Sequence, residues 1–322
     1  MLLPVGGLFF LVAWLRRLAY RIGVLRSVRL PVPVVVIGNI IAGGAGKTPL
    51  TLWLATRLRD RGRHPGIVSR GYGRINTAIL EVGAAATARE AGDEPLLLAR
   101  RSQCPVVVGA DRAAAARALL SAHPECDLIL CDDGLQHYRL QRDVEIAVLD
   151  RRGLMNGWPL PAGPLRESSR RMGRVHALVL NGLPTPPAVT EVRPFTMRLL
   201  GDRFYRADDP ARTCSAADLA GLRLHAVAGI GEPQRFFDHL AGMGVHFVPH
   251  AFPDHHDYRS ADLEFVGDAL LTTEKDAIKC AGLGTLPIWV LPVEAVVEPD
   301  LAGHVLELLN YLEISPHGPA TA

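Results

Sequence analysis

The chain has 322 residues, of which 48% are hydrophobic and 21% charged, and this length and composition fit a globular protein with two α/β cores. A formal net charge of only +2 argues against a general affinity for nucleic acid. Five cysteines form no C-x-x-C pair and lie in or beside apolar segments, which indicates buried, reduced thiols. His255-His256 has no second ligand pair at metal spacing, so a zinc site is not expected.

The first 28 residues combine an apolar segment with arginines. Residues 2–15 are apolar or small, and the spacing of Leu11, Leu15, Leu18, Ile22 and Leu25 predicts a helix with Arg16, Arg17 and Arg21 on its other side. The apolar segment is shorter than the roughly 20 residues that span a bilayer. We therefore expect an amphipathic helix in the membrane interface, with arginines at the lipid phosphates. A core helix of the first domain and a single spanning anchor are the alternatives.

A glycine-rich loop follows the first predicted strand, residues 34–37. The loop and the start of the next helix contain Gly43, Gly44, Ala45, Gly46, Lys47, Thr48 and Pro49. This order predicts a phosphate-binding P-loop, in which Lys47 reaches the β- and γ-phosphates and Thr48 ligates Mg²⁺. Ile41 stands where the full pattern has its first glycine. The alternative is a glycine turn with an exposed lysine.

A second apolar segment, residues 127–131, ends in the carboxylates Asp132 and Asp133. Successive side chains at the end of a strand point to opposite sides, so one carboxylate can serve Mg²⁺ while the other contacts the loop. An ordinary Asp-Gly turn is the alternative.

Apolar strands alternate with helices along the first 194 residues. Strands are predicted at 34–37, 65–69, 105–109, 127–131, 144–149 and 176–181, and the alanine-rich residues 113–121 predict a helix between them. This alternation favours an α/β fold, a P-loop NTPase-type doubly wound parallel sheet spanning residues 29–194.

A proline-rich stretch at 183–194 marks the predicted end of this domain. Residues 195–200 and 203–206 flank Gly201-Asp202 and predict a hairpin linker, residues 195–212. A second, smaller α/β domain is expected at 213–322, with strands near 224–230, 245–249 and 287–291.

Charged residues cluster in loops where a parallel sheet places its ligands. Asp93 and Glu94 begin a predicted helix, and His255 follows a strand of the second domain. Asp93 in such a place can take a proton from an attacking hydroxyl while a histidine orients it. Considered separately, Asp93 is more typical of a helix N-cap and His255 of a surface histidine.

Several blocks of the sequence resemble the tetraacyldisaccharide 4′-kinase family, the lipid A 4′-kinases of Gram-negative bacteria. They occur in the family's order over nearly the whole chain: Ser69-Arg70-Gly71-Tyr72-Gly73, Gly92-Asp93-Glu94-Pro95, Asp132-Asp133-Gly134-Leu135-Gln136-His137, Asn156-Gly157-Trp158, Pro161-Ala162-Gly163-Pro164-Leu165-Arg166-Glu167 and Thr273-Glu274-Lys275-Asp276. Ile41 is typical of this family.

The resemblance implies transfer of the γ-phosphoryl group of ATP to the 4′-hydroxyl of tetraacyldisaccharide 1-phosphate, with ATP and Mg²⁺ as cofactors. It implies Asp93 as general base paired with His255. The implied metal-side residues are Thr48, Glu94, Asp132 and Asp133. Motif positions near the phosphates are Ser69, Arg70, Gln136 and His137. In the family the nucleotide lies between two α/β domains joined by a two-stranded linker.

The expected partners are the lipid substrate and the inner-membrane surface on its cytoplasmic face, with no nucleic acid and no obligate protein partner. The rival hypothesis is a membrane-peripheral P-loop ATPase switch acting on a protein. A guanine-specific switch is disfavoured, because Lys275 lies one place late in Thr273-Glu274-Lys275-Asp276. A kinase for a soluble small molecule would not need residues 1–25.

Overall fold

The first sheet is built around β1 (Val34–Gly38), a strand whose residues are all buried. In the computed structural model, which describes residues 2–188, 190–280 and 282–314, β1 pairs in parallel with β5 (Leu128–Asp132) and β6 (Val144–Asp150). Such continuous apolar strands suit a parallel sheet covered on both faces. The strand order is β15-β8-β7-β6-β1-β5-β2-β4-β3. The remaining members are β2 (Pro65–Ser69), β3 (Leu80–Glu81), β4 (Val106–Val108), β7 (Ala177–Asn181), β8 (Pro194–Leu200) and β15 (Glu294–Glu298).

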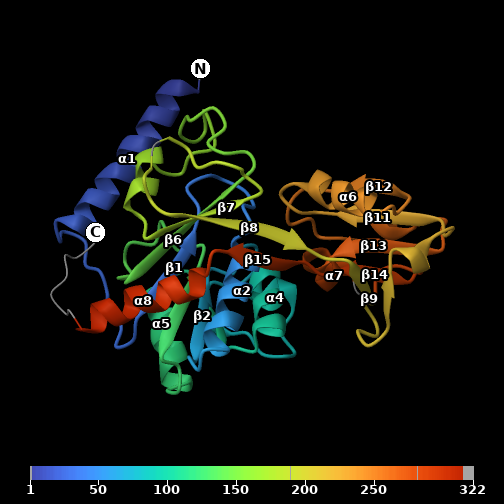
Figure 1. Ribbon diagram of the computed structural model, residues 1–322, viewed down its shortest axis with the longest axis horizontal. Helices are drawn as coiled ribbons and strands as arrows, with labels where there is room; N and C mark the ends of the chain where they lie inside the picture. Colours follow the sequence, from blue (N-terminus) through green and yellow to red (C-terminus); the bar gives the residue numbers. More distant parts are fainter. Residues whose placement is uncertain (1, 189, 281, 315–322) are drawn as a thin grey trace.

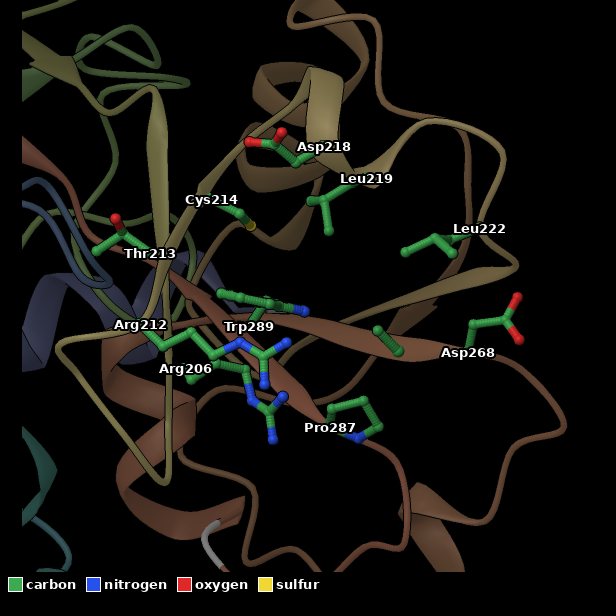
Figure 2. Close-up of a pocket in the computed structure, with 11 residues that line it drawn as sticks. Arg206, Arg212, Thr213, Cys214, Asp218, Leu219, Leu222, Asp268, Pro287 and Trp289 are labelled. Carbon is green, nitrogen blue, oxygen red and sulfur yellow. The ribbon is translucent and has the colours of Figure 1, made fainter.

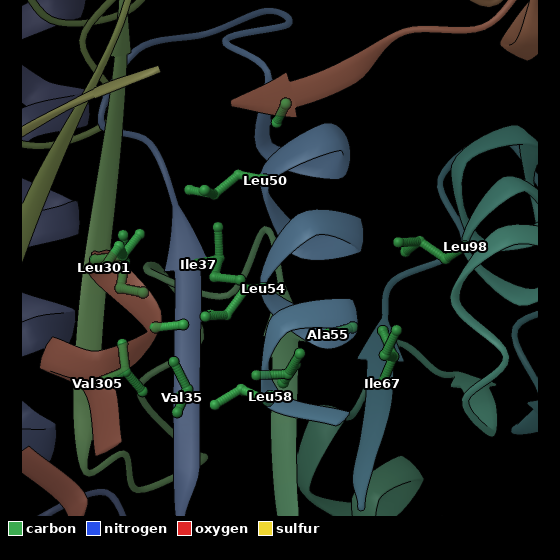
Figure 3. Packing of buried hydrophobic residues seen from close by; sticks show 14 of the residues in the cluster. Val35, Ile37, Leu50, Leu54, Ala55, Leu58, Ile67, Leu98, Leu301 and Val305 are labelled. Atoms are coloured by element: carbon green, nitrogen blue, oxygen red, sulfur yellow. The ribbon is translucent and has the colours of Figure 1, made fainter. Parts of the chain in front are cut away.

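Helices cover both faces of this sheet, which confirms the doubly wound α/β fold (Figure 1). On one face, Leu50, Leu54 and Leu58 of α2 (Lys47–Arg59) point toward Val35 and Ile37 of β1 (Figure 3). α5 (Arg112–Ala122) contributes to the core on the other face. The other helical segments of this domain are α3 (Ala88–Ala91), α4 (Asp93–Ser102), η1 (Ser169–Arg174) and α8 (Leu301–Ile314).

The second domain has its own sheet, in the order β10-β9-β14-β13-β11-β12. Its strands are β9 (Arg203–Arg206), β10 (Thr213–Ser215), β11 (Leu224–Ala228), β12 (Phe247–Ala251), β13 (Ala269–Thr273) and β14 (Ile288–Leu291). Its helical segments are η2 (Ala217–Leu219), α6 (Pro233–Gly242), η3 (Ser260–Leu263) and α7 (Glu274–Cys280). Phe204, Phe236 and Phe237 belong to one of its core clusters. The five cysteines of the chain are buried and free, as the sequence predicts.

The predicted pairing of 195–200 with 203–206 is wrong. β8 is parallel to β7 in the first sheet and antiparallel to β15, whereas β9 pairs with β14 and β10 in the second sheet. Two strands do connect the domains, but they are β8 and β15, which are nearly a hundred residues apart in the chain. A long-range partner therefore replaces the local hairpin.

The predicted extent of the second domain, 213–322, is also wrong at its C-terminal end. After β14 the chain returns through β15 to the first sheet and continues into α8. Leu301 and Val305 of α8 are fully buried in the same cluster as β1 and α2 (Figure 3). Residues 294–314 thus complete the P-loop domain; the last eight residues of the prediction lie outside the described part of the chain.

The N-terminal helix, α1 (Leu3–Arg21), runs along the edge of the P-loop domain that lies away from the second domain (Figure 1). Gly6 is its one buried residue, and a Cβ there would lie 3.2 Å from the Cβ of Ala162. The core-helix alternative therefore does not fit. The helix ends at Arg21, so Ile22 and Leu25 of the predicted repeat lie beyond it. By length and composition alone α1 could cross a membrane.

Candidate active site

The P-loop is held between β1 and α2 by contacts that require glycine. Gly46 adopts φ +92° as the N-cap of α2, and a Cβ there would lie 2.5 Å from Nδ2 of Asn181. Asn181, at the end of β7, donates from Nδ2 to the carbonyl of Ala45 at 3.0 Å. The loop conformation is thus fixed from a neighbouring strand, and its backbone N–H groups lie at the start of α2.

Ile41 departs from the general P-loop pattern because it is part of the core. Its side chain is fully buried, and its backbone forms an isolated antiparallel bridge with Leu165. The Ala42 N–H donates to the carbonyl of Pro164, and the Arg166 N–H donates to the carbonyl of Ile40. Residues 161–167 therefore hold in place the segment that leads into the P-loop.

Asp133 lies among cationic side chains at the end of β5. Lys47 Nζ is 3.7 Å from its Oδ1, and Arg166 Nη1 donates to both carboxylate oxygens at 3.2 and 3.1 Å. Burial would raise the pKa of Asp133, but the charges of Lys47 and Arg166 outweigh it and lower that pKa below its usual value. Asp133 also has φ +48°, a conformation that is uncommon outside glycine and concentrates at functional sites.

Asp132, the last residue of β5, has different partners from Asp133. Its Oδ1 accepts from Thr51 Oγ1 at 3.0 Å, while its Oδ2 is buried without a hydrogen-bond partner. Burial, together with the charges of Glu94 and Asp133, raises the pKa of Asp132 to about 7. This concentration of negative charge suits a cation.

Mg²⁺ fits this set of oxygen atoms. Within the described residues no three His, Cys, Asp or Glu side chains converge as a metal cluster. Mg²⁺ commonly takes one or two carboxylates and completes its shell with phosphate oxygens and water. The orphaned Oδ2 of Asp132 and the buried Thr48 at the start of α2 are compatible with that mode.

Asp93 is not a helix N-cap. Gly92 is the N-cap of α4, with φ +91°, and a Cβ on Gly92 would lie 2.9 Å from the carbonyl oxygen of Tyr72. The Asp93 carboxylate is directed to the second domain, where Oδ2 contacts His255 Nδ1 at 3.2 Å and Lys279 Nζ at 3.1 Å. Burial opposes ionisation, but the hydrogen bond from His255 and the charge of Lys279 lower the pKa of Asp93 below its ordinary value.

His255 is held in a strained backbone conformation after β12. Its φ is +63°, and its ring lies 4.9 Å from the ring of Tyr72 in the first domain. Lys275 Nζ lies 3.4 Å from His255 Nε2, 2.8 Å from Asp254 Oδ1 and 3.8 Å from Glu94 Oε1. The structure thus brings Asp93, Glu94 and His255 together across the two domains.

The other predicted positions have different surroundings. Gln136 donates from Nε2 to the Asn39 carbonyl at 3.0 Å and to Glu167 Oε1 at 2.8 Å. His137 Nε2 accepts the backbone N–H of Arg112 at the start of α5. Ser69 is buried at the end of β2, and the next residue, Arg70, is exposed.

Sequence reasoning missed several residues that position the site. They are Thr51, Asn181 and Lys279, and also Arg166 and Lys275, which the sequence presents only as parts of motifs. Thr51 lies one helical turn after the predicted Lys47, and Lys279 lies one turn after Lys275, a member of the Thr273–Asp276 motif; that spacing is the available signal.

A separate cavity of about 470 Å³ lies in the second domain (Figure 2). Arg206 and Arg212 lie over the indole of Trp289, with guanidinium carbons 5.4 and 5.9 Å from the ring centroid. Arg206 is also paired with Asp208. None of the residues that line this cavity belongs to the predicted site, and the two cation–π contacts stabilise the edge of the second sheet.

Comparison with known proteins gives one consistent family. The family model described as tetraacyldisaccharide-1-P 4′-kinase matches residues 1–310. A tetraacyldisaccharide 4′-kinase of Azoarcus sp. (strain BH72) is 53% identical over 97% of this chain and 92% of its own length. One of Aromatoleum aromaticum is 52% identical over 100% and 95%. A crystal structure of LpxK from Aquifex aeolicus in complex with ATP has a TM-score of 0.81 at 30% identity, covering 96% of this chain and 98% of that one.

Proposed function

The chain belongs to the tetraacyldisaccharide 4′-kinase family, the ATP-dependent kinases of lipid A biosynthesis, and we propose that Asp93 is the base of its phosphoryl transfer. The carboxylate is buried and ionised, and it contacts His255 and Lys279 of the second domain. Both contacts from the second domain fall on Oδ2, so Oδ1 is the oxygen that we assign to the acceptor.

In this proposal Oδ1 takes the proton of the acceptor 4′-hydroxyl. The hydroxyl oxygen bonds to the γ-phosphorus, the bond to the β–γ bridging oxygen breaks, and ADP leaves. His255 holds the carboxylate in place from the second domain.

The nucleotide phosphates are assigned to the P-loop, residues 43–49. Lys47 binds the β- and γ-phosphates, and Arg166 holds Asp133 beside it. Mg²⁺, when bound, neutralises charge that develops on the transferring group. Thr48 and Asp132 would hold it, with Glu94 and Asp133 as neighbouring acids.

The acceptor is assigned to the side of the P-loop domain that carries α1. Arg16 Nη1 donates to the Gln136 carbonyl at 3.1 Å, and the guanidinium carbon of Arg17 lies 5.7 Å from the centre of the Tyr138 ring. These contacts attach α1 next to the motif that ends β5. An exposed apolar helix at this place would hold the enzyme on the inner-membrane surface, at its cytoplasmic face, where the lipid acceptor presents its headgroup.

A radiolabel transfer assay tests the base. With γ-labelled ATP, Mg²⁺ and tetraacyldisaccharide 1-phosphate in detergent, the wild-type enzyme should label the lipid. Asp93→Asn should lose at least a hundredfold in turnover, the scale of a general base, and keep its affinity for ATP. Asp60→Asn is the matched control. Asp60 is the C-cap of α2, at the end of that helix away from the P-loop, so this variant should label the lipid and bind ATP as the wild-type enzyme does.

Lys47→Ala separates binding from chemistry, because it should weaken ATP binding itself. Equal loss of ATP affinity in Lys47→Ala and Asp93→Asn would refute the assignment of separate roles. Phosphate release without labelled lipid from the wild-type enzyme would favour the ATPase switch.

A further inference from the structure

The start of α6 forms a contact between the two domains that is separate from the one at Asp93. Glu232, the N-cap of α6, accepts from Arg151 Nε at 3.0 Å, directly after β6 of the P-loop domain. The residue before it approaches the P-loop so closely that a Cβ on Gly231 would lie 3.1 Å from the backbone N of Gly44. The second domain therefore packs directly against the phosphate-binding loop.

Arg235, in the first turn of α6, contacts the side chain that holds the P-loop. Its Nη2 donates to Oδ1 of Asn181 at 3.3 Å, and Nδ2 of the same amide donates to the carbonyl of Ala45 at 3.0 Å. Asn181 is 1% exposed, so its amide depends on partners within the protein. One buried amide thus connects the second domain to the backbone of the P-loop.

We propose that Arg235 is a positioning residue for ATP binding, which fixes the orientation of the Asn181 amide and, through that amide, the conformation of the P-loop. This inference rests on the proposed assignment of the nucleotide phosphates to residues 43–49. The observation that carries it is the pair of hydrogen bonds that leads from Arg235 in one domain to the Ala45 carbonyl in the other.

The chemistry of the two partners decides which way the amide points. A guanidinium has only donors and a backbone carbonyl only acceptors, whereas a side-chain amide has an acceptor at one end and donors at the other. In the observed orientation both contacts of Asn181 are hydrogen bonds. With oxygen and nitrogen exchanged, the NH₂ group would face the guanidinium and the oxygen would face the Ala45 carbonyl, and both contacts would be repulsive.

Removal of Arg235 would leave Oδ1 of Asn181 buried without this donor. An unpaired buried acceptor is costly, so the amide would turn toward other partners and loosen its bond to Ala45. The Ala45 carbonyl and the Gly46 N–H belong to one planar trans peptide and point in opposite directions. A carbonyl fixed on Asn181 therefore also fixes the direction of the Gly46 N–H, one of the backbone donors that a P-loop presents to phosphate.

Calorimetric titration of the full-length enzyme in detergent with Mg²⁺ and AMP-PNP, an ATP analogue that is not hydrolysed, measures nucleotide binding without the lipid acceptor. Arg235→Met keeps most of the length of the side chain and removes its donors. We expect Kd for AMP-PNP to rise about three- to tenfold, the scale of one hydrogen bond. Arg235→Lys restores a donor and should recover most of the affinity. An unchanged Kd in Arg235→Met would overturn the proposal.

Steady-state kinetics separate this role from a general loss of structure. In the label-transfer assay Arg235→Met should raise KM for ATP by the same factor as Kd and leave kcat and KM for the lipid within about twofold, because the P-loop holds the phosphates in both the ground state and the transition state. A fall in kcat at unchanged KM for ATP would indicate a smaller folded fraction and contradict the proposal. Gln234→Met, which changes an exposed neighbour whose contact is with Asp238 of the same helix, is the matched control and should leave all three constants unchanged.

A double-mutant cycle tests whether Arg235 acts through Asn181. Asn181→Leu removes both contacts of the amide, so adding Arg235→Met to it should weaken AMP-PNP binding no further. Effects that multiply in the double variant would show that Arg235 acts on the nucleotide directly, and they would overturn the proposal.

Asn181→Asp keeps the shape of the side chain and its contact with Arg235 but has no donor for Ala45, so it tests the same step if Asn181→Leu does not fold. It should weaken AMP-PNP binding by itself, and wild-type affinity in this variant would contradict the proposal. Failure of the wild-type enzyme to label the lipid would refute the proposed function, and it would leave the AMP-PNP measurements standing.

Discussion

The surroundings of His137 hold its imidazole neutral. Nε2 accepts the backbone N–H of Arg112, one of the donors left unpaired at the start of α5. Burial and the positive charge of Arg112 are the main causes that lower the pKa of His137 to about 4; Asp111 opposes them, and Arg142 and Arg16 add to them. The histidine thus has a structural partner in the P-loop domain, in addition to its predicted place near the phosphates.

This pKa predicts acid sensitivity. The unfolded chain binds a proton at His137 near pH 6.5 and the folded protein only near pH 4, so stability is present above about pH 6.5 and is lost as the pH falls toward 4. At pH 5 the loss from this residue is about 2 kcal/mol.

Denaturant unfolding at pH 7 and pH 5 measures this effect. His137→Gln should show a smaller difference in unfolding free energy between the two pH values than wild type does. His246→Gln, which changes an exposed histidine of the second domain, should show the wild-type difference. The same pH dependence in wild type and His137→Gln would contradict the assignment.

The residues of the site differ in how far sequence could predict them. Lys47, Asp132 and Asp133 follow from local patterns, since a strand, a glycine loop and a helix are neighbours in the chain. The meeting of Asp93 with Lys279 depends on two domains and almost two hundred residues of chain. Local spacing cannot select such a pair, because the fold of both domains must be known first.

At the scale of elements, buried parallel strands were predictable and pairings between distant segments were not. β1, β5 and β6 are buried throughout and mainly apolar, because helices cover both faces of their sheet. β15 reads Glu-Ala-Val-Val-Glu, only three apolar residues between two glutamates, and this gives little signal by itself. The local pattern places its partner β8 in a hairpin, since Gly201-Asp202 is a good turn sequence and competes with the true partner.

The packing of α8 in the core of the P-loop domain predicts an effect on stability. Val305 of α8 is fully buried in the cluster formed by β1 and α2, so Val305→Ala removes two methyl groups from the core of the P-loop domain. The expected cost is about 2 kcal/mol of unfolding free energy, measured as a lower thermal midpoint. Tyr311→Ala, an exposed position of the same helix, should cost little.

Hydrogen exchange identifies the domain that is affected. In Val305→Ala, faster exchange should appear in β1 and α2, where the side chain packs, and protection of β11 and β13 should be retained. Faster exchange confined to β11 and β13 would place α8 with the second domain and contradict the fold described above.

For the molecule as a whole, the two ends of the P-loop domain face different partners. The second domain meets it at Asp93 and Glu94, while α1 lies along the other edge (Figure 1). Arg16 and Arg17 connect α1 to the segment after β5, whose carboxylates begin the phosphate site. A lipid acceptor held at the membrane would thus approach from the α1 side. The second domain could then close over the site without entering the bilayer.

Charge placed on α1 tests this arrangement. Leu8 and Leu15 are exposed and, seven residues apart, lie on one side of the helix, so Leu8→Glu/Leu15→Glu puts two carboxylates into the apolar surface. In flotation with vesicles of phosphatidylethanolamine and phosphatidylglycerol, the wild-type protein should rise with the lipid and the double variant should stay in the soluble fraction. Val266→Glu, at an 86% exposed position of the second domain, should float as wild type does.

The double variant should keep its ATP affinity, because α1 makes no contact with the P-loop among the described interactions. Flotation of the double variant equal to wild type would show that the apolar surface of α1 does not hold the enzyme on the membrane, and attachment would then have to come from another surface of the P-loop domain.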